Sequence, residues 1–356
     1  MPLRQELYFA KLRALVASRW PSAASGPLSE LSFPTGAALL GPDTLWVLDE
    51  SSTGRSVGAA LAVASARLGT DAAVQLIAAG QTGDLARKAA YFRPPVDVWA
   101  IDGPRTVPAS PEPLRSCTGR AEGEWVVTWQ RRIAAAGAEP VLEDGVLRAE
   151  VLGLEVARVE TGSGLPVLAV GVGRHDRLAH QMVDSGEEPF GALERAVQQV
   201  RRHRVHGAPS HPANQLARER WLRAVLVARP EIVGAVRLAA VSTPALPQQL
   251  GVYSPAAALG TDADGSSMVV VASVGVDPEL VVAGADAREA LGAEKLVLAV
   301  PEADRKPFGN MVAERLRRPA EWRSVGGQWA AVPLRRPAGA RGPAASPAPD
   351  PLRPRR

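Results

Sequence analysis

Short apolar runs alternate with helical patterns in the first third of the sequence, and this alternation constrains the fold more than any other feature. Residues 44–49, 73–77 and 96–101 have the length and β-branched content of strands, and the two segments between them have helical periodicity. Strands joined by helices predict parallel pairing with right-handed crossovers. We therefore expect residues 1–108 to form an amphipathic N-terminal helix and a small parallel-sheet βαβαβ unit.

A proline- and glycine-rich segment, residues 103–124, marks the boundary to a second block. The expected helices of this block lie at 125–136, 190–204, 213–228, 286–291 and 310–317, and its expected strands at 141–152, 154–160, 166–172, 268–274 and 295–300. The last two strands are almost continuously apolar, as in strands buried on both faces. The predicted fold class is α/β, with a larger mixed-sheet domain of αβββαβ type over residues 122–332. We recognise no internal repeat in the sequence.

The C-terminal residues 333–356 consist mainly of proline, alanine and arginine, and we expect them to be disordered. Six arginines and one aspartate give this tail a charge of +5. The whole chain carries +4, so the other 332 residues sum to 4 − 5 = −1. The basic isoelectric point therefore reflects the tail rather than the folded part.

Composition excludes several classes of protein. Hydrophobic residues make up 46% of the chain and charged residues 22%, which is the balance of an ordinary globular protein. The single cysteine, Cys117, excludes a disulfide scaffold, and no apolar run approaches the roughly 20 residues of a membrane span. Charged residues interrupt the first 20 positions, unlike a secretory signal. The strong preference for arginine over lysine indicates a GC-rich, bacterial source, and we expect a cytoplasmic protein.

The order of helix, three meandering strands, helix, strand, helix and strand over residues 122–302 resembles the core of the restriction-endonuclease-like nucleases, the PD-(D/E)XK superfamily. In that family an acid on the second strand binds a metal, and the third strand carries an acid and a lysine two residues apart. The alignment places Glu155 at the first acid, Gly171 at the second and Gly173 at the lysine. Because glycine cannot hold a cation, the resemblance implies a degenerate nuclease core.

A second hypothesis is a metal-dependent hydrolase or nuclease with an atypical acidic site. Asp277 follows one late apolar strand, and Glu302 and Asp304 follow the other, so parallel pairing of these strands would bring the acids to one sheet edge. The candidate catalytic residues are Glu155, His175, Asp176, Asp277 and Glu302. The sequence establishes no cofactor, and this alternative would use a divalent metal.

All five histidines lie between residues 175 and 211. His203, His206 and His211 are spaced so that a helix end and the following turn could bring imidazoles together on a metal. Polar residues are equally expected at a helix end and in a turn. Both interpretations stay open, and the sequence assigns no metal ligand.

The basic residues of the predicted folded part concentrate on the helical patterns at 190–204 and 213–228. Antiparallel packing of these helices would form one face that contacts phosphates, with a tryptophan as a stacking surface; a solvated face in an arginine-rich chain is the alternative. The candidate nucleic-acid-binding residues are Arg201, Arg202, Arg204, Arg218, Arg220, Trp221 and Arg223.

The segment 49–54 follows the first strand of the βαβαβ unit and matches no phosphate-binding motif. We expect Ser51 to Thr53 to cap the next helix. The leading hypothesis for the whole chain is a non-catalytic nucleic-acid-associated or interaction module on a degenerate nuclease-like core. The metal-dependent enzyme and a protein-binding scaffold are the alternatives. The substrate, the partner and the oligomeric state cannot be read from the sequence.

Overall fold

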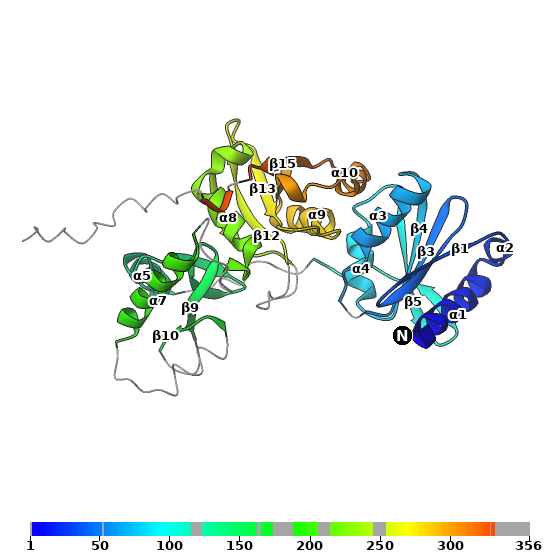
Figure 1. The fold of residues 1–356 in the computed structure, drawn as a ribbon, viewed down its shortest axis with the longest axis horizontal. Helices are drawn as coiled ribbons and strands as arrows, with labels where there is room; N and C mark the ends of the chain where they lie inside the picture. The colour runs from blue at the N-terminus through cyan, green and yellow to red at the C-terminus, as the bar shows by residue number, and fades with distance from the viewer. Residues whose placement is uncertain are drawn as a thin grey trace, which may run out of the picture.

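The computed structural model describes residues 2–51, 53–114, 123–161, 165–173, 188–205, 214–244, 254–327 and 329–331. The predicted C-terminal tail, His175, Asp176, His206 and His211 lie outside these residues. Three sheets follow one another along the chain, with β1 to β6 in the first, β7 to β10 in the second and β11 to β15 in the third (Figure 1). The α/β class is confirmed, with the small N-terminal unit preceding a larger part of mixed strand direction.

The first unit is a six-stranded sheet in the order β1-β2-β3-β4-β5-β6. Its elements are α1 (Pro2–Arg19), α2 (Pro21–Ala24), β1 (Ser29–Phe33), β2 (Gly36–Leu40), β3 (Thr44–Asp49), α3 (Val57–Leu68), β4 (Ala73–Ala78), α4 (Thr82–Ala89), β5 (Val96–Asp102) and β6 (Arg105–Pro108). The three predicted strands are β3, β4 and β5, and they pair in parallel. β1, β2 and β6 add antiparallel strands on either side, which the sequence analysis did not predict.

Helices cover both faces of this sheet. α1 packs on one face against Leu39, Trp46 and Ile77, and α3 and α4 cover the other face. The alternation of side chains along β3 separates these two environments, since Trp46 faces α1 whereas Val47 faces α3.

The second unit is an antiparallel sheet in the order β10-β9-β8-β7, with α5 and α7 packed on it. Its elements are α5 (Glu124–Ala135), β7 (Glu139–Glu143), β8 (Val146–Val151), β9 (Leu154–Glu160), β10 (Val167–Val170) and α7 (Pro189–His203). The single strand predicted over 141–152 is wrong. Asp144 and Gly145 both have positive φ, of 52° and 73°, and form a tight hairpin that divides it into β7 and β8.

The third unit is a five-stranded sheet in the order β11-β12-β13-β14-β15. Its elements are α8 (Arg218–Ala228), η2 (Pro230–Val233), β11 (Ala235–Val241), β12 (Ala256–Asp262), β13 (Ser267–Ala272), α9 (Leu280–Leu291), β14 (Lys295–Pro301), η3 (Glu302–Asp304), α10 (Pro307–Glu314), β15 (Glu321–Val325) and η4 (Trp329–Ala331). The predicted parallel pairing of the two late apolar strands, β13 and β14, is confirmed. These strands lie in a different sheet from β7 to β10.

The third sheet has the topology of the first five strands, β1 to β5, of the first sheet. In each, two antiparallel pairings are followed by two parallel ones, and the parallel strands are joined by two helices. No internal repeat was recognised in the sequence, and the shared pairing pattern is seen only in the structure. This pattern did not emerge from the sequence because β1, β2, β11, β12 and β15 were not predicted as strands.

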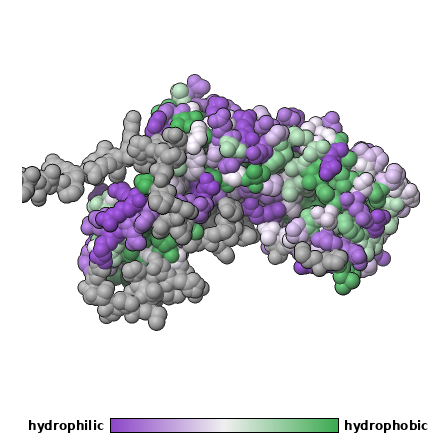
Figure 2. All heavy atoms as spheres, in the orientation of Figure 1, coloured by the Kyte–Doolittle hydropathy of each residue, from purple (hydrophilic) through white to green (hydrophobic). Residues whose placement is uncertain are grey.

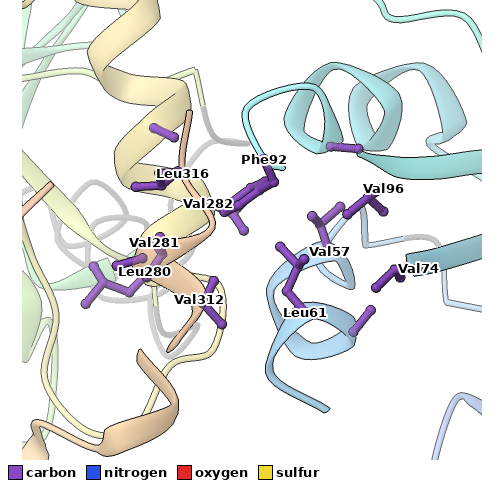
Figure 3. Packing of buried hydrophobic residues seen from close by; sticks show 14 of the residues in the cluster. Val57, Leu61, Val74, Phe92, Val96, Leu280, Val281, Val282, Val312 and Leu316 are labelled. Atoms are coloured by element: carbon purple, nitrogen blue, oxygen red, sulfur yellow. The ribbon is translucent and has the colours of Figure 1, made fainter. Parts of the chain in front are cut away.

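The helices of these two sheets pack against each other. One continuous apolar core includes Val57 and Leu61 of α3, Val282 of α9 and Val312 of α10 (Figure 3). Gly58 allows the closest approach, because a Cβ atom there would lie 2.1 Å from the backbone oxygen of Pro278. The order of layers is sheet, helices, helices, sheet.

Replacing Gly58 with alanine is expected to destabilise the protein by about 1–3 kcal/mol, because the added methyl group overpacks this interface against backbone. Alanine in an exposed helix would instead stabilise by up to about 1 kcal/mol. Urea denaturation measures the difference. Gly326→Ala, where no atom lies within 4 Å of the added group, is the control. An unchanged midpoint for Gly58→Ala would contradict the packing.

Candidate functional site

A buried cluster of charged residues joins the second sheet to α8. Arg220 and Arg223 of α8 both contact Glu143 of β7 and Glu150 of β8. Arg220 lies 2.7 Å from Glu143 Oε2 and 2.9 Å from Glu150 Oε1, and Arg223 lies 3.0 Å from Glu150 Oε2. Each of these side chains is at most 8% exposed. The cluster is part of the protein interior.

Burial opposes the ionisation of both glutamates of this cluster. For Glu143 the charges of Arg223, Arg220 and Arg148 outweigh burial and lower its pKa. For Glu150 burial prevails over the same arginines, with the charge of Glu143 as a further cause, and its pKa is raised. The two glutamates thus share their negative charge unequally beneath the guanidinium groups of Arg220 and Arg223.

This cluster changes the interpretation of the predicted basic face. Arg220 and Arg223 point into the second sheet and are not available to phosphates. Arg204 is also buried; it donates to the backbone oxygens of Leu216 and Ala217 and lies over the Trp221 ring at 4.5 Å. The expected stacking surface on Trp221 is therefore occupied. The prediction of one exposed face is wrong for these four residues.

Two of the predicted basic residues, Arg201 and Arg202, are exposed near the C-terminal end of α7. Arg218 is half-buried at the start of α8. The exposed pair lies beside other arginines that the sequence analysis did not select. The exposed arginines of α5 and α7 are Arg131, Arg132, Arg195, Arg201 and Arg202.

The two helices α5 and α7 lie together on one face of the second sheet. Their buried residues share one core with Leu147 and Ala149 of β8. At their junction the rings of Trp129 and Phe190 stack with centroids 5.6 Å apart, and the Arg132 guanidinium lies 3.8 Å from the Phe190 centroid. Arg201 donates to the backbone oxygen of Gly137 at 2.6 Å. We call the stacked pair of Trp129 and Phe190 the aromatic seam. Figure 2 shows hydrophilic residues gathered on the surface where Figure 1 draws α5 and α7.

The charge balance of this helix pair is positive. The pair carries five exposed arginines against Glu124, Glu194 and the N-cap residue Glu188, which pairs with Arg132 at 3.5 Å, and this gives 5 − 3 = +2. The folded part as a whole is close to neutral. We call the exposed surface of α5 and α7 the α5–α7 face. In the sequence, this face corresponds to arginines at the polar positions of two amphipathic helices. Arg131 on the first helix and Arg195 on the second are 64 residues apart.

The acids of the predicted catalytic set are separated in the structure. Glu155 on β9 contacts Arg158 at 2.7 Å and Arg148 at 3.1 Å. Asp277 and Glu302 lie at the carboxyl edge of the third sheet, as predicted from the parallel pairing. Asp277 binds Arg55 of the first unit at 3.0 Å. His175 and Asp176 lie outside the described residues.

Nothing among these acids forms a metal centre in the described part of the chain. Asp304 accepts a hydrogen bond from the Gly275 amide at 2.7 Å, and Glu302 is exposed. Among the described residues no group of three or more histidine, cysteine, aspartate or glutamate side chains is placed to hold a metal ion. His203 is the one histidine within them.

The segment after β3 does not cap α3 through its hydroxyl side chains. α3 begins at Val57, and its N-cap residue Ser56 makes no side-chain capping bond, so the capping prediction is wrong for Ser51 and Thr53. Ser52 lies outside the described residues. The Ser51 amide instead donates to Asp49 Oδ1 at 2.8 Å. Glu50 pairs with Lys11 of α1 at 2.7 Å.

A second buried polar cluster lies where α4 meets α9. Asp286 of α9 accepts hydrogen bonds from Arg87 at 3.0 Å and from the Tyr91 hydroxyl at 2.8 Å. Asp286, on a helix of the third unit, therefore pairs with two residues of the first unit. Burial opposes ionisation of Asp84, but hydrogen bonds from Lys88 and Arg87 outweigh it and lower its pKa.

Glu279 lies at the same interface, before α9. One of its carboxyl oxygens accepts the Ala59 amide at 3.0 Å. Burial raises the pKa of Glu279 to about 7. The charge of Asp277 also raises this pKa, whereas the charges of Lys88 and Arg55 lower it. The side chain is therefore close to half-protonated at neutral pH.

Comparison with known proteins finds no match to a family model, a curated protein or a solved structure. No helix within the described residues has the length and apolar character needed to span a membrane.

Removing Arg223 is expected to destabilise the protein by about 3–5 kcal/mol, because it leaves Glu143 and Glu150 buried with one partner fewer. Arg223→Met keeps most of the side-chain volume. Chemical denaturation should show the loss, and Arg202→Met, at an exposed position, should change stability little. Equal stabilities of the two variants would show that the buried pairs do not hold the second sheet to α8.

The raised pKa of Glu279 predicts a pH dependence of stability. An unfolded glutamate ionises near pH 4.5, so between pH 4.5 and 7 the unfolded state loses its proton first and stability falls as pH rises. Glu279→Gln removes this loss of stability. As the pH rises from 4.5 to 8, the free energy of unfolding of the variant is expected to gain roughly 3 kcal/mol relative to that of the parent. Thermal melting across this range tests it, with Glu302→Gln as the exposed control. Parallel pH profiles of Glu279→Gln and parent would refute it.

Proposed function

We propose that this chain is a nucleic-acid-binding protein that contacts phosphates through the α5–α7 face. The observation that carries the proposal is the set of five exposed arginines on two adjacent helices of an otherwise nearly neutral folded part. Arginine on a surface of this kind neutralises backbone phosphates and releases their counterions. A bacterial cytoplasmic setting belongs to the same proposal.

The ion pairs between the expected catalytic acid Glu155 and two arginines favour binding of nucleic acid over its cleavage. Glu155, the residue at the first acid of the nuclease-like pattern, is engaged by two arginines. A carboxylate that neutralises guanidinium groups in a half-buried site is a poor ligand for a divalent cation. The α5–α7 face needs no such cation to hold a phosphate chain.

The aromatic seam supports a rigid positioning of the arginines. Trp129 and Phe190 stack and fix the position of Arg132 over the ring. Ordered side chains lose less conformational entropy on binding than free ones. A polyanion crossing the two helices would therefore meet a face on which the position of Arg132 is already fixed.

The proposal is tested by fluorescence anisotropy of single- and double-stranded DNA across a salt series. The triple variant Arg131→Gln, Arg195→Gln, Arg202→Gln removes three exposed charges and leaves Arg132 and Arg201, which make internal contacts, in place. Its binding is expected to weaken, and the slope of log K against log salt on duplex DNA to shrink by about 2–3, since each phosphate contact contributes about 0.9.

The matched control is Arg67→Gln, Arg105→Gln, Arg237→Gln, which removes the same charge from exposed positions outside the second unit. The six tail arginines are present in both variants, so the difference between them reports the folded face. An equal slope for the two variants, or no binding by the parent protein, would refute the proposal.

A further inference from the structure

The first and third units share more than their sheet topology. The first crossover helix has 12 residues in each unit, α3 and α9, and the second has eight residues in each, α4 and α10. Each first helix ends in a leucine followed by a glycine with positive φ, Gly69 at 98° and Gly292 at 61°. Length, order and helix ending thus correspond between residues 44–102 and 267–325.

A similar correspondence follows the second helix of each unit. The first unit reads Arg93-Pro94-Pro95 before β5, and the third reads Arg317-Arg318-Pro319 before β15. This places Phe92 of the first unit at the position of Leu316 in the third.

These equivalent segments meet in the structure. Phe92 and Leu316 form an isolated antiparallel bridge. The Arg93 amide donates to the Arg315 oxygen at 2.8 Å, and the Arg317 amide donates to the Tyr91 oxygen at 2.9 Å. Exchanging each residue for its equivalent converts one hydrogen bond into the other. The two units are therefore related by an approximate two-fold axis at this bridge, which is the arrangement of a symmetric dimer.

The two halves of the interface differ in chemistry. Where α3 meets α10, the contact is apolar and includes Leu61 and Val312. Where α4 meets α9, the contact is the buried pair of Arg87 and Asp286. Counted back from the Leu-Gly helix ends, Val63 of the first unit corresponds to Asp286 of the third. Counted back from the Phe92–Leu316 pair, Met311 of the third unit corresponds to Arg87 of the first.

This difference decides which units can pair. Two copies of the first unit would place Arg87 opposite a valine, and two copies of the third would place Asp286 opposite a methionine. Two copies of the third unit would leave Asp286 buried without a guanidinium partner, and two copies of the first would leave Arg87 with only Asp84 of its own helix. Loss of a buried ionic partner is strongly disfavoured. Only the pairing of the first unit with the third satisfies both charges.

We infer that the two units are diverged copies of one ancestral unit, and that their contact is a dimer interface enclosed within one chain. Each unit is the binding partner of the other, and the Arg87–Asp286 pair makes this pairing selective. The helix surfaces that a separate unit would use for dimerisation are already covered. The chain accordingly works as a monomer with a single copy of the intervening second unit.

The inference is tested on the full chain with a protease site inserted within residues 115–122, which join the first unit to the second. After cleavage, the first unit is expected to remain bound to the rest of the chain on gel filtration, at the mass of one 37.4 kDa chain by light scattering. Arg87→Met and Asp286→Val each leave one buried charge, and each is expected to weaken this association by about a hundredfold or more.

The double variant Arg87→Met, Asp286→Val removes both charges and is expected to associate more tightly than either single variant. Circular dichroism of the uncut variants shows whether they fold. Gly326→Ala, an open position on the third unit, is the control and should stay associated. The inference fails if the cut parent chain separates, if the double variant is no tighter than the singles, or if the intact chain is a dimer.

Discussion

The packing of helices from two sheets against each other is the contact on which the rest of the structure depends. α3 and α4 cover one face of the first sheet, and α9 and α10 cover one face of the third, so each helix layer buries apolar surface on both sides. An isolated unit would leave its helices half-solvated, with Leu61 or Val312 exposed. The hydrophobic gain of this single core therefore depends on both units being present.

The second unit is attached by a different kind of contact. Glu143 and Glu150 of its sheet are held by Arg220 and Arg223 of α8, in a site that water scarcely reaches. Buried ion pairs add little net stability, yet breaking one is costly, so they favour one arrangement over alternatives. Gly153 takes part by permitting close approach, since a Cβ atom there would lie 2.4 Å from the Arg220 oxygen. The junction orients the α5–α7 face away from the first unit (Figure 1).

The strongly periodic elements could be predicted from the sequence, and the weakly patterned ones could not. β3, β4, β13 and β14 are apolar runs buried in parallel sheets, and their parallel pairing followed from the intervening helices. β6 and β15 are short edge strands with exposed polar residues, so no apolar run marked them. Asp144-Gly145 is typical of a hairpin turn. It was overlooked because the apolar stretch around it has the length of one strand.

The site was harder to predict because charge in a sequence does not show where a side chain points. Arg201 and Arg223 belong to the same basic region of the sequence, residues 190–228, yet Arg201 is exposed. Arg223 is buried, and its acidic partners lie 73 and 80 residues away in the sequence. Only the packing of α8 on the second sheet separates them. The exposed arginines of α5 were missed because they lie far from this region in the sequence.

The central claim, that the first and third units share one core, is tested most directly by native-state hydrogen exchange in Phe92→Ala. Phe92 belongs to the first unit and is fully buried against Leu316 and Val282 of the third. We predict that the substitution lowers the opening free energy of amides in β14 as much as in β4, because both sheets open together. Unchanged protection in β14 with reduced protection in β4 would show that the units are independent and contradict the account.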